Sequence, residues 1–311
     1  MKHLSKASVS RRTIGEDAVN QRVDNYLSKV LKGVPKSHIY RILRSGEVRV
    51  NGKRVEPNYR LKFGDQLRIP PVRTAKPAQQ RKVSAPSLQL EVLFEDDALL
   101  AINKPSGIAV HGGSGVSSGV IELLRMREPK PGFLELVHRL DRETSGVLLL
   151  AKKRSALTAL HQRLREGRVE KRYLAMVKGR WLNQKKSVQL PLHKYLTAAG
   201  ERRVIVKTGG QTAHTLFYLR KNWPEFSLLE AELKTGRTHQ IRIHLAHLGF
   251  PVLGDPKYGD FALNRSLEIR GLKRMFLHAF KLVVKHPVSG AVLHLEAPLP
   301  SELQNFISQL E

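Results

Sequence analysis

A stretch without acidic residues divides this sequence into two parts of unequal length. Residues 71–87 contain three prolines and four basic residues but no Asp or Glu, a composition typical of linkers. The chain has 311 residues, 41% of them hydrophobic, which is enough for more than one folded unit. We therefore expect a flexible leader over residues 1–19, a small unit over residues 20–70 and a larger domain over residues 88–311.

The small unit shows two helical patterns followed by a hairpin. Apolar residues recur at helical spacing over residues 23–31 and again over residues 39–43, which predicts two amphipathic helices. Asn51-Gly52 then lies between alternating apolar and basic residues, and this dipeptide is a strong signal for a tight hairpin. A further strand is expected at residues 67–69.

The chain is strongly basic, and the small unit is especially so. Lys and Arg number 54 against 27 Asp and Glu, a formal net charge of +27, and residues 1–70 hold sixteen basic against six acidic residues. Such a chain is expected to meet a polyanion, with nucleic acid favoured over an anionic membrane. No apolar stretch approaches the length of a spanning helix. The candidates for phosphate contacts in the small unit are Lys36, Arg41, Arg44, Arg49, Lys53 and Arg54.

The larger domain is dominated by strand patterns. Short apolar or alternating runs are separated by turn residues, a few helical patterns lie between them, and there is no regular alternation of strand and helix. This arrangement favours the α+β class with many antiparallel strands. The strands are expected at residues 90–94, 99–102, 147–151, 171–177, 204–207, 212–219, 226–233, 281–285 and 291–296.

A dense polar cluster, His138 to Gly146, directly precedes the apolar run at residues 147–151. Asp141 lies between Arg139 and Arg142, so the arginines would keep the carboxylate ionised and supply charge for phosphate. A polar loop anchored on a buried strand is a common site for catalysis. In isolation, the same cluster could be a surface loop with a salt bridge.

A second polar cluster, residues 235–245, begins a short helix. It includes Arg237 and His239, and Arg242 falls beside the apolar face of the helix. A buried arginine needs a counter-charge, and a carboxylate is the natural partner.

Metal and nucleotide cofactors are not expected. The chain has thirteen histidines but no cysteine, and neither a His-Glu-x-x-His motif nor a nearby acidic group completes a metal site. The glycine-rich stretch at residues 111–115 lacks the Gly-Lys-Ser/Thr of a phosphate loop.

One aspartate without a clear second carboxylate does not fit ordinary glycoside hydrolysis. An ionised aspartate could instead act as nucleophile or electrostatic stabiliser at a sugar C1′. An enzyme that releases a free base from RNA and a non-catalytic RNA-binding or ribosome-assembly factor stay open as alternatives on the residues alone.

Four segments resemble the RluA family of RNA pseudouridine synthases in order and spacing. They are residues 103–107 (Asn-Lys-Pro-Ser-Gly), 138–146, 171–175 (Lys-Arg-Tyr-Leu-Ala) and 235–242. The small unit is similar to the S4 RNA-binding domain. The resemblance implies a mixed, largely antiparallel sheet with a cleft across it, no cofactor, and isomerisation of uridine in 23S ribosomal RNA of the large subunit or in another RNA such as tRNA.

The resemblance also implies roles for particular residues. Asp141 would be the catalytic aspartate, Arg242 its orienting partner, and Tyr173 the residue that stacks on the target base. Arg139 would help to extrude the uridine, because this chemistry cannot occur within a base stack. Further RNA contacts are expected from His138, Arg142, Lys104, Arg237 and His239. The enzyme would be a cytoplasmic monomer without membrane or nucleotide partners.

Overall fold

The structure is a computed structural model that describes residues 8–31, 33–72, 90–112, 118–127, 132–197 and 200–311. The chain divides into two compact units, Met1–Leu88 and Gln89–Glu311. The predicted linker lies outside the described residues from residue 73 onward, as does most of the glycine-rich stretch at 111–115. No helix in the described ranges is long and apolar enough to cross a membrane.

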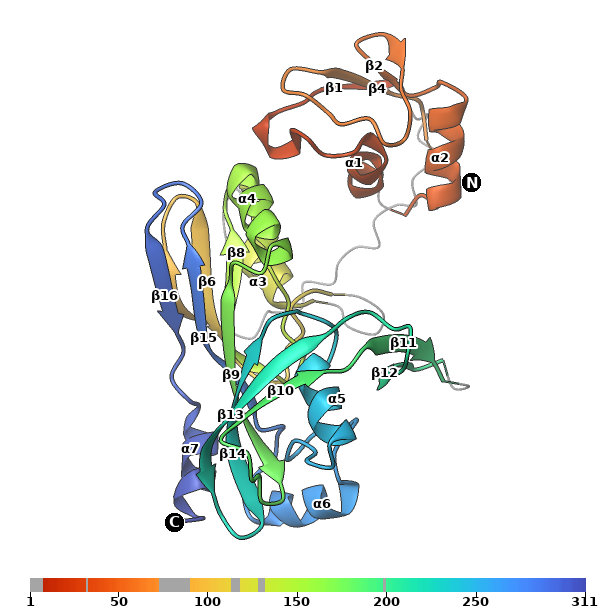
Figure 1. Ribbon diagram of the computed structural model, residues 1–311. Coiled ribbons are helices and arrows are strands. Elements are labelled where there is room, and N and C mark those ends of the chain that lie inside the picture. Colours follow the sequence, from red (N-terminus) through yellow and green to blue (C-terminus); the bar gives the residue numbers. More distant parts are fainter. Residues whose placement is uncertain (1–7, 32, 73–89, 113–117, 128–131, 198–199) are drawn as a thin grey trace, which may run out of the picture. The chain divides into compact units, whose positions relative to one another are not determined.

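The smaller unit packs two helices against a four-stranded antiparallel sheet in the order β1-β4-β2-β3 (Figure 1). The apolar faces of the helices, with Leu27 and Ile39 at their centres, share one core with Leu67 of the sheet. Asn51 and Gly52 both have positive φ and make the predicted hairpin turn. The elements are β1 (Ser10–Thr13), α1 (Val23–Val30), α2 (Lys36–Arg44), β2 (Arg49–Val50), β3 (Lys53–Arg54) and β4 (Gln66–Ile69).

The start of this unit corrects the prediction of a flexible leader. Strand β1 pairs with β4, and a short 3-10 helix, η1 (Glu16–Ala18), follows it. Ile14 and Ala18 are buried in the core of the unit, and the Ile14 amide donates to the carbonyl of Asp65 at 2.9 Å. Two apolar residues in a polar stretch make no periodic pattern, so this pairing could not be predicted.

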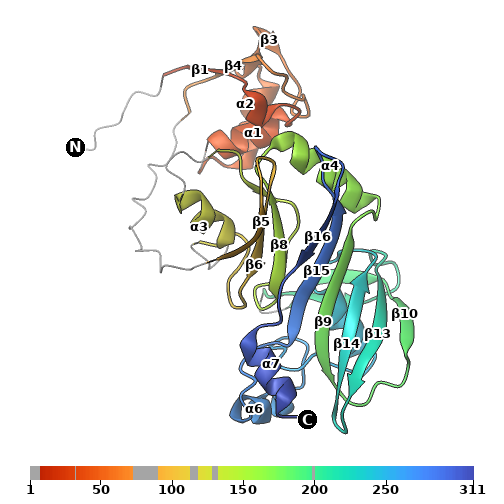
Figure 2. The same cartoon turned by 90° about the vertical axis from the view of Figure 1, so that its left-hand side faces the viewer.

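The larger unit is built on a sheet of ten strands, eight of which form the row β10-β13-β14-β9-β15-β8-β6-β5 (Figure 2). Its pairings are antiparallel except where β15 runs parallel to β8. The strands are β5 (Glu91–Glu95), β6 (Leu99–Lys104), β7 (Glu135–Leu136), β8 (Ser145–Ala151), β9 (Glu170–Lys178), β10 (Lys185–Gln189), β13 (His214–Asn222), β14 (Phe226–Leu233), β15 (Leu277–Lys285) and β16 (Val292–Glu296).

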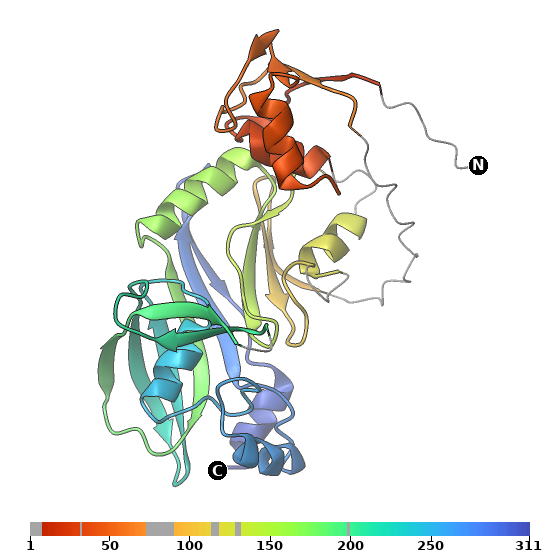
Figure 3. The ribbon, with the colours of Figure 1, turned by 90° about the vertical axis from the view of Figure 1, so that its right-hand side faces the viewer.

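Helices and a separate hairpin surround this sheet. Leu160 of α4 packs with Leu149 of the sheet in one apolar cluster, and Phe306 of α7 packs with Phe226 and Phe276 in another. Helix α5 contacts β12 of the hairpin and lies beside it in Figure 3. These elements are α3 (Val120–Arg127), α4 (Arg154–Arg165), β11 (Leu192–Leu196), β12 (Arg202–Val206), α5 (Gln240–His247), α6 (Phe261–Ile269) and α7 (Ser301–Ser308).

The predicted α+β class with a mixed, largely antiparallel sheet is confirmed. Most strands begin and end within a few residues of the expected ranges, because alternation and turn residues are local signals. Helices α3, α6 and α7 were not predicted, nor were the strands β7, β10 and β11. Their apolar patterns are short, and contacts with distant elements decide their conformation.

Candidate active site

A cavity of about 1390 Å³ opens in the larger unit, where residues from both polar clusters meet strand β9 and the β11–β12 hairpin. Among the described residues that line it, Asp141 is the one carboxylate, against nine Lys or Arg. The volume exceeds that of usual small-molecule sites. Its size and charge therefore suit part of a polyanionic macromolecule.

Asp141 forms an ion pair with the buried Arg242, which also forms one with a second aspartate, Asp255. Arg242 Nη1 donates to Asp141 Oδ2 at 2.9 Å, and its Nε and Nη2 each donate to the carboxylate of Asp255 at 2.7 Å. The Arg242 side chain is 5% exposed and that of Asp255 1%, whereas Asp141 is 25% exposed. Arg242 thus has the predicted carboxylate partner, and Asp141 keeps one side open to the cavity.

Asp255 fixes the arginine because backbone hydrogen bonds hold its own carboxylate in place. The backbone amides of Lys257 and Tyr258 donate to Asp255 Oδ1 at 2.8 and 3.0 Å. Burial by itself raises the pKa of this carboxyl, but the hydrogen bonds and charge of Arg242 outweigh it, so the pKa is lowered. The guanidinium also lies over the Tyr258 ring, 5.1 Å from its centroid. These contacts leave Arg242 a single orientation toward Asp141.

The loop that carries Asp141 is fastened by the Asn-Lys-Pro-Ser-Gly segment at the end of β6. Lys104 Nζ donates to the carbonyls of Pro105, Ile108 and Arg142 at 2.8, 2.8 and 3.1 Å. Lys104 is fully buried, and burial lowers its pKa to about 7. The prediction that Lys104 contacts RNA is wrong, because its ammonium is enclosed and its three donors are occupied by carbonyls.

A close approach of two strands sets the end of the same loop. Gly146 has φ 112°, and a Cβ atom there would lie 2.2 Å from the carbonyl oxygen of Ala279. Gly146 and Ala279 are partners in the parallel pair β8–β15. Glycine is therefore required at the point where the polar loop enters the buried strand.

Tyr173 and His239 reach the cavity from two other elements. Tyr173 on β9 is 7% exposed, and burial and the charge of Asp141 raise its pKa, so its hydroxyl stays protonated. His239 precedes α5 in the left-handed region (φ 55°), with Nε2 3.9 Å from Asp141 Oδ1. A hydrogen bond of 2.8 Å joins its Nδ1 to the Tyr258 hydroxyl.

His138 lines the cavity and is also tied to the sheet. Its Nε2 accepts a hydrogen bond from the backbone amide of Leu149 at 3.1 Å. Burial and the nearby charge of Lys171 lower its pKa to about 4, so the ring is neutral and braces the polar loop against β8. The side chain is half-buried at the wall of the cavity, and its contact with RNA stays a prediction.

The predicted arginines lie at the surface of the site. Arg139 is exposed and lines the cavity. Arg142 is also exposed, and its Nε donates to the carbonyl of Gly107 at 2.9 Å. Arg237 is exposed and donates from Nε to the carbonyl of Thr212 at 3.1 Å. Each keeps further N–H groups that can reach a phosphate.

The six basic candidates of the smaller unit are all exposed. Three come from α2 and three from the strands β2 and β3 and their flanks, so they are free to meet a nucleic-acid backbone. They are Lys36, Arg41, Arg44, Arg49, Lys53 and Arg54.

Asp255 and Lys171 are among the residues of the site that were not predicted. Asp255 follows a Leu-Gly turn at residues 253–254, and nothing in the local sequence ties it to Arg242. Lys171 was noted within its motif, but no role was assigned to it. It is 9% exposed and lines the cavity beside Tyr173. The sequence indicates that a buried Arg242 needs a carboxylate partner, but it does not show which carboxylate that is.

Comparison with known proteins agrees with this geometry. A family model described as RNA pseudouridylate synthase matches residues 98–247, and an S4 domain model matches residues 21–67. The chain is 50% identical to ribosomal large subunit pseudouridine synthase C of Pasteurella multocida over 307 residues, covering 97% of this chain and 94% of the relative. It is 50% identical to the protein of that name in Escherichia coli K12 over 311 residues, with 97% of each covered.

A solved structure supports the assignment of the larger unit. Human RNA pseudouridylate synthase domain containing 4 superposes with a TM-score of 0.58 at 26% identity, covering 71% of this chain and 92% of that one. The fold and site thus define an RNA-modifying isomerase with an S4 domain. The chain belongs to the RNA pseudouridine synthase family, whose members convert uridine in RNA to pseudouridine.

Proposed function

We propose that this enzyme isomerises specific uridines of the 23S ribosomal RNA of the large subunit, with Asp141 as the catalytic aspartate. The names of the relatives that match nearly the whole chain support this substrate. The observation that carries the catalytic assignment is that Asp141 is the one carboxylate among the described residues that line a basic cavity, and that Arg242 orients it at 2.9 Å. The enzyme then works as a monomer in the cytoplasm, where bacterial ribosomal RNA lies.

The reaction needs no external donor. The C1′–N1 bond breaks and its electron pair stays on the base, the base turns, and C5 bonds to C1′. The proton on C5 leaves and N1 gains one, so the mass of the RNA is unchanged. Asp141 acts at C1′ as nucleophile or as electrostatic stabiliser. Arg242 positions its carboxylate, and its second partner Asp255 keeps the guanidinium from turning away.

The uridine must leave its stack to reach Asp141. Arg139 is exposed at the rim of the cavity, where its side chain can occupy the space that the base vacates. Tyr173 lies inside and offers its ring to the base. Arg142, Arg237 and the basic residues of the S4 domain contact phosphates, which gives affinity without sequence information.

The decisive experiment maps pseudouridine in large-subunit ribosomal RNA from cells that lack the gene. Loss of specific pseudouridines, restored by the wild-type gene but not by Asp141→Asn, is the expected result. Restoration by Asp141→Asn would remove the proposed role of that carboxylate. An unchanged ribosomal pattern would refute the substrate, and tRNA would then be mapped in the same cells.

Deletion of residues 1–75 tests the S4 domain. The deletion removes the six exposed basic candidates, so RNA binding should weaken by roughly tenfold or more at physiological salt. The rate of a single turnover at saturating RNA should persist, because Asp141, Arg242 and Asp255 all belong to the larger unit. Binding isotherms at several salt concentrations measure the effect. Unaltered affinity would show that the S4 domain has no part in binding.

A further inference from the structure

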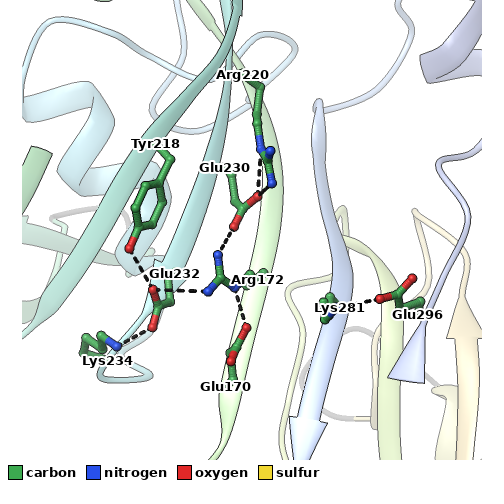
Figure 4. A network of polar contacts seen from close by, with 9 residues as sticks. All are labelled: Glu170, Arg172, Tyr218, Arg220, Glu230, Glu232, Lys234, Lys281 and Glu296. Carbon is green, nitrogen blue, oxygen red and sulfur yellow. Dashed lines mark hydrogen bonds and ion pairs between the residues drawn. The ribbon is translucent and has the colours of Figure 1, made fainter. Parts of the chain in front are cut away.

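Lys171 and Arg172 are consecutive cations on strand β9 that have opposite electrostatic surroundings. Residues alternate between the two faces of a strand, so Arg172 points to one face while Lys171 and Tyr173 point to the cavity. Figure 4 shows Arg172 among the carboxylates of Glu170, Glu230 and Glu232. The same sheet thus supplies three carboxylates to one cation and none to its neighbour.

Lys171 is a buried cation without a counter-ion. It is 9% exposed, and burial is the cause that lowers its pKa. In the described part of the chain, no hydrogen bond or ion pair engages its ammonium, and the nearby His138 is neutral. A cation in this position is costly for a protein unless something binds it.

The Lys171 ammonium lies where two motifs of the site meet. A Cβ atom at Gly236, in the loop before α5, would be 4.0 Å from Lys171 Nζ. Lys171 and Tyr173 are two residues apart on the same face of β9, about 6.6 Å along the strand. The two side chains are buried to a similar degree, at 9% and 7% exposed. A substrate group that enters the cavity far enough to contact Tyr173 is therefore also the group that reaches Lys171.

We propose that the Lys171 ammonium binds a carbonyl oxygen of the extruded uracil and stabilises the negative charge that the base acquires when C1′–N1 breaks. This inference rests on the proposed function and adds a residue to it. The electron pair of the broken bond spreads over N1, O2 and O4 of uracil, and a desolvated ammonium placed beforehand stabilises that charge more than it stabilises the neutral ground state. Phosphates of the RNA backbone are left to the exposed arginines at the rim.

The test compares Lys171→Met and Lys171→Gln with Arg172→Gln, which removes one positive charge from the next residue of the same strand. Single-turnover rates at saturating large-subunit ribosomal RNA, RNA dissociation constants and melting temperatures are measured for each. The two Lys171 variants should lose roughly 10²-fold or more in rate, with affinity for RNA unchanged and a melting temperature equal to or above that of the wild type. Arg172→Gln should keep the wild-type rate.

Three results would overturn the inference. Weaker RNA binding with a smaller salt dependence and an unchanged rate would make Lys171 a phosphate contact. An unchanged rate and affinity would show that the ammonium touches no part of the substrate. Unfolding of both Lys171 variants would show a structural role. The wild-type enzyme, assayed in parallel, separates these results from failure of the proposed function, because only the latter leaves wild type inactive on this RNA.

Discussion

The two faces of strand β9 use charge in different ways. On the outer face, the one that carries Arg172, Glu230 is fully buried and forms ion pairs with Arg172 and Arg220 (Figure 4). Glu232 forms ion pairs with Arg172 and Lys234 and accepts a hydrogen bond from the Tyr218 hydroxyl. Each of these charges has a partner within the protein. On the cavity face, none of the residues that the structure describes supplies such a partner to the buried Lys171.

This comparison distinguishes charges that stabilise the fold from charges that are available to bind a ligand. A network of mutually satisfied ions is complete when the protein is folded, so its loss affects stability. An unsatisfied cation reduces stability until a ligand arrives, so its loss affects function. Arg242 belongs to both kinds. Its ion pair with Asp255 is complete within the fold, and its ion pair with Asp141 positions a carboxylate that faces the cavity.

The largest effect on stability and rate is expected at Asp255, the carboxylate that holds Arg242 in place. Asp255→Asn removes a buried carboxylate that accepts two hydrogen bonds from Arg242, which should lower the free energy of unfolding by about 3 kcal/mol. It should also slow a single turnover by roughly tenfold or more, because Arg242 can then turn away from Asp141.

Urea unfolding and single-turnover assays measure both effects. Asp260→Asn is the matched control, since Asp260 is a more exposed helix cap. Asparagine caps a helix as well as aspartate does, so this change should leave both the free energy of unfolding and the rate close to those of the wild type. Equal behaviour of the two variants would mean that Asp255 has no special bearing on the site.

Arg172→Gln tests the outer face. Glu230 keeps Arg220 as a partner, so the free energy of unfolding should fall by about 2 kcal/mol, less than for Asp255→Asn. The turnover rate should be that of the wild type, because Arg172 faces away from the cavity. A slow but fully stable variant would erase the distinction between the faces.

The smallest effect is a pH dependence of stability that Lys171 introduces. The pKa of Lys171 is lowered in the folded state because burial disfavours its charged form. At a pH below the folded-state pKa the lysine is charged in both states, and the full cost of burying that charge lowers the stability of the fold. This penalty disappears as pH rises to the unfolded pKa of about 10.4. Lys171→Met should therefore be more stable than wild type at neutral pH, and the two should converge at alkaline pH. Denaturant titrations between neutral pH and pH ~10 measure this, and a constant difference would contradict the burial argument.

Several parts of the fold could be predicted because their signals are local. Helical spacing located α1 and α2, Asn51-Gly52 located a hairpin, and the apolar run after Gly146 located β8. The first strand could not be found, since it pairs with β4, more than fifty residues further along the chain, and Ile14 and Ala18 are buried in the core of that same unit.

The site shows the same division. Sequence patterns were enough to predict that Asp141 lies between arginines on a loop before a buried strand, and that Arg242 needs a carboxylate partner. The sequence could not distinguish a basic residue that meets RNA from one that is enclosed, so Lys104 was placed wrongly. The composition of a polar motif is the same whether a side chain turns outward or inward.

Which charges are paired follows from the tertiary structure. Asp255 lies against Arg242 although the two are thirteen residues apart in the chain, and three carbonyls surround the Lys104 ammonium. Three carboxylates contact Arg172, whereas none from the described residues contacts Lys171. The physical reason is that the energy of a charge depends on burial and on partners within a few ångströms. Those neighbours come from strands and loops that are distant in sequence, so they exist only once the sheet has formed.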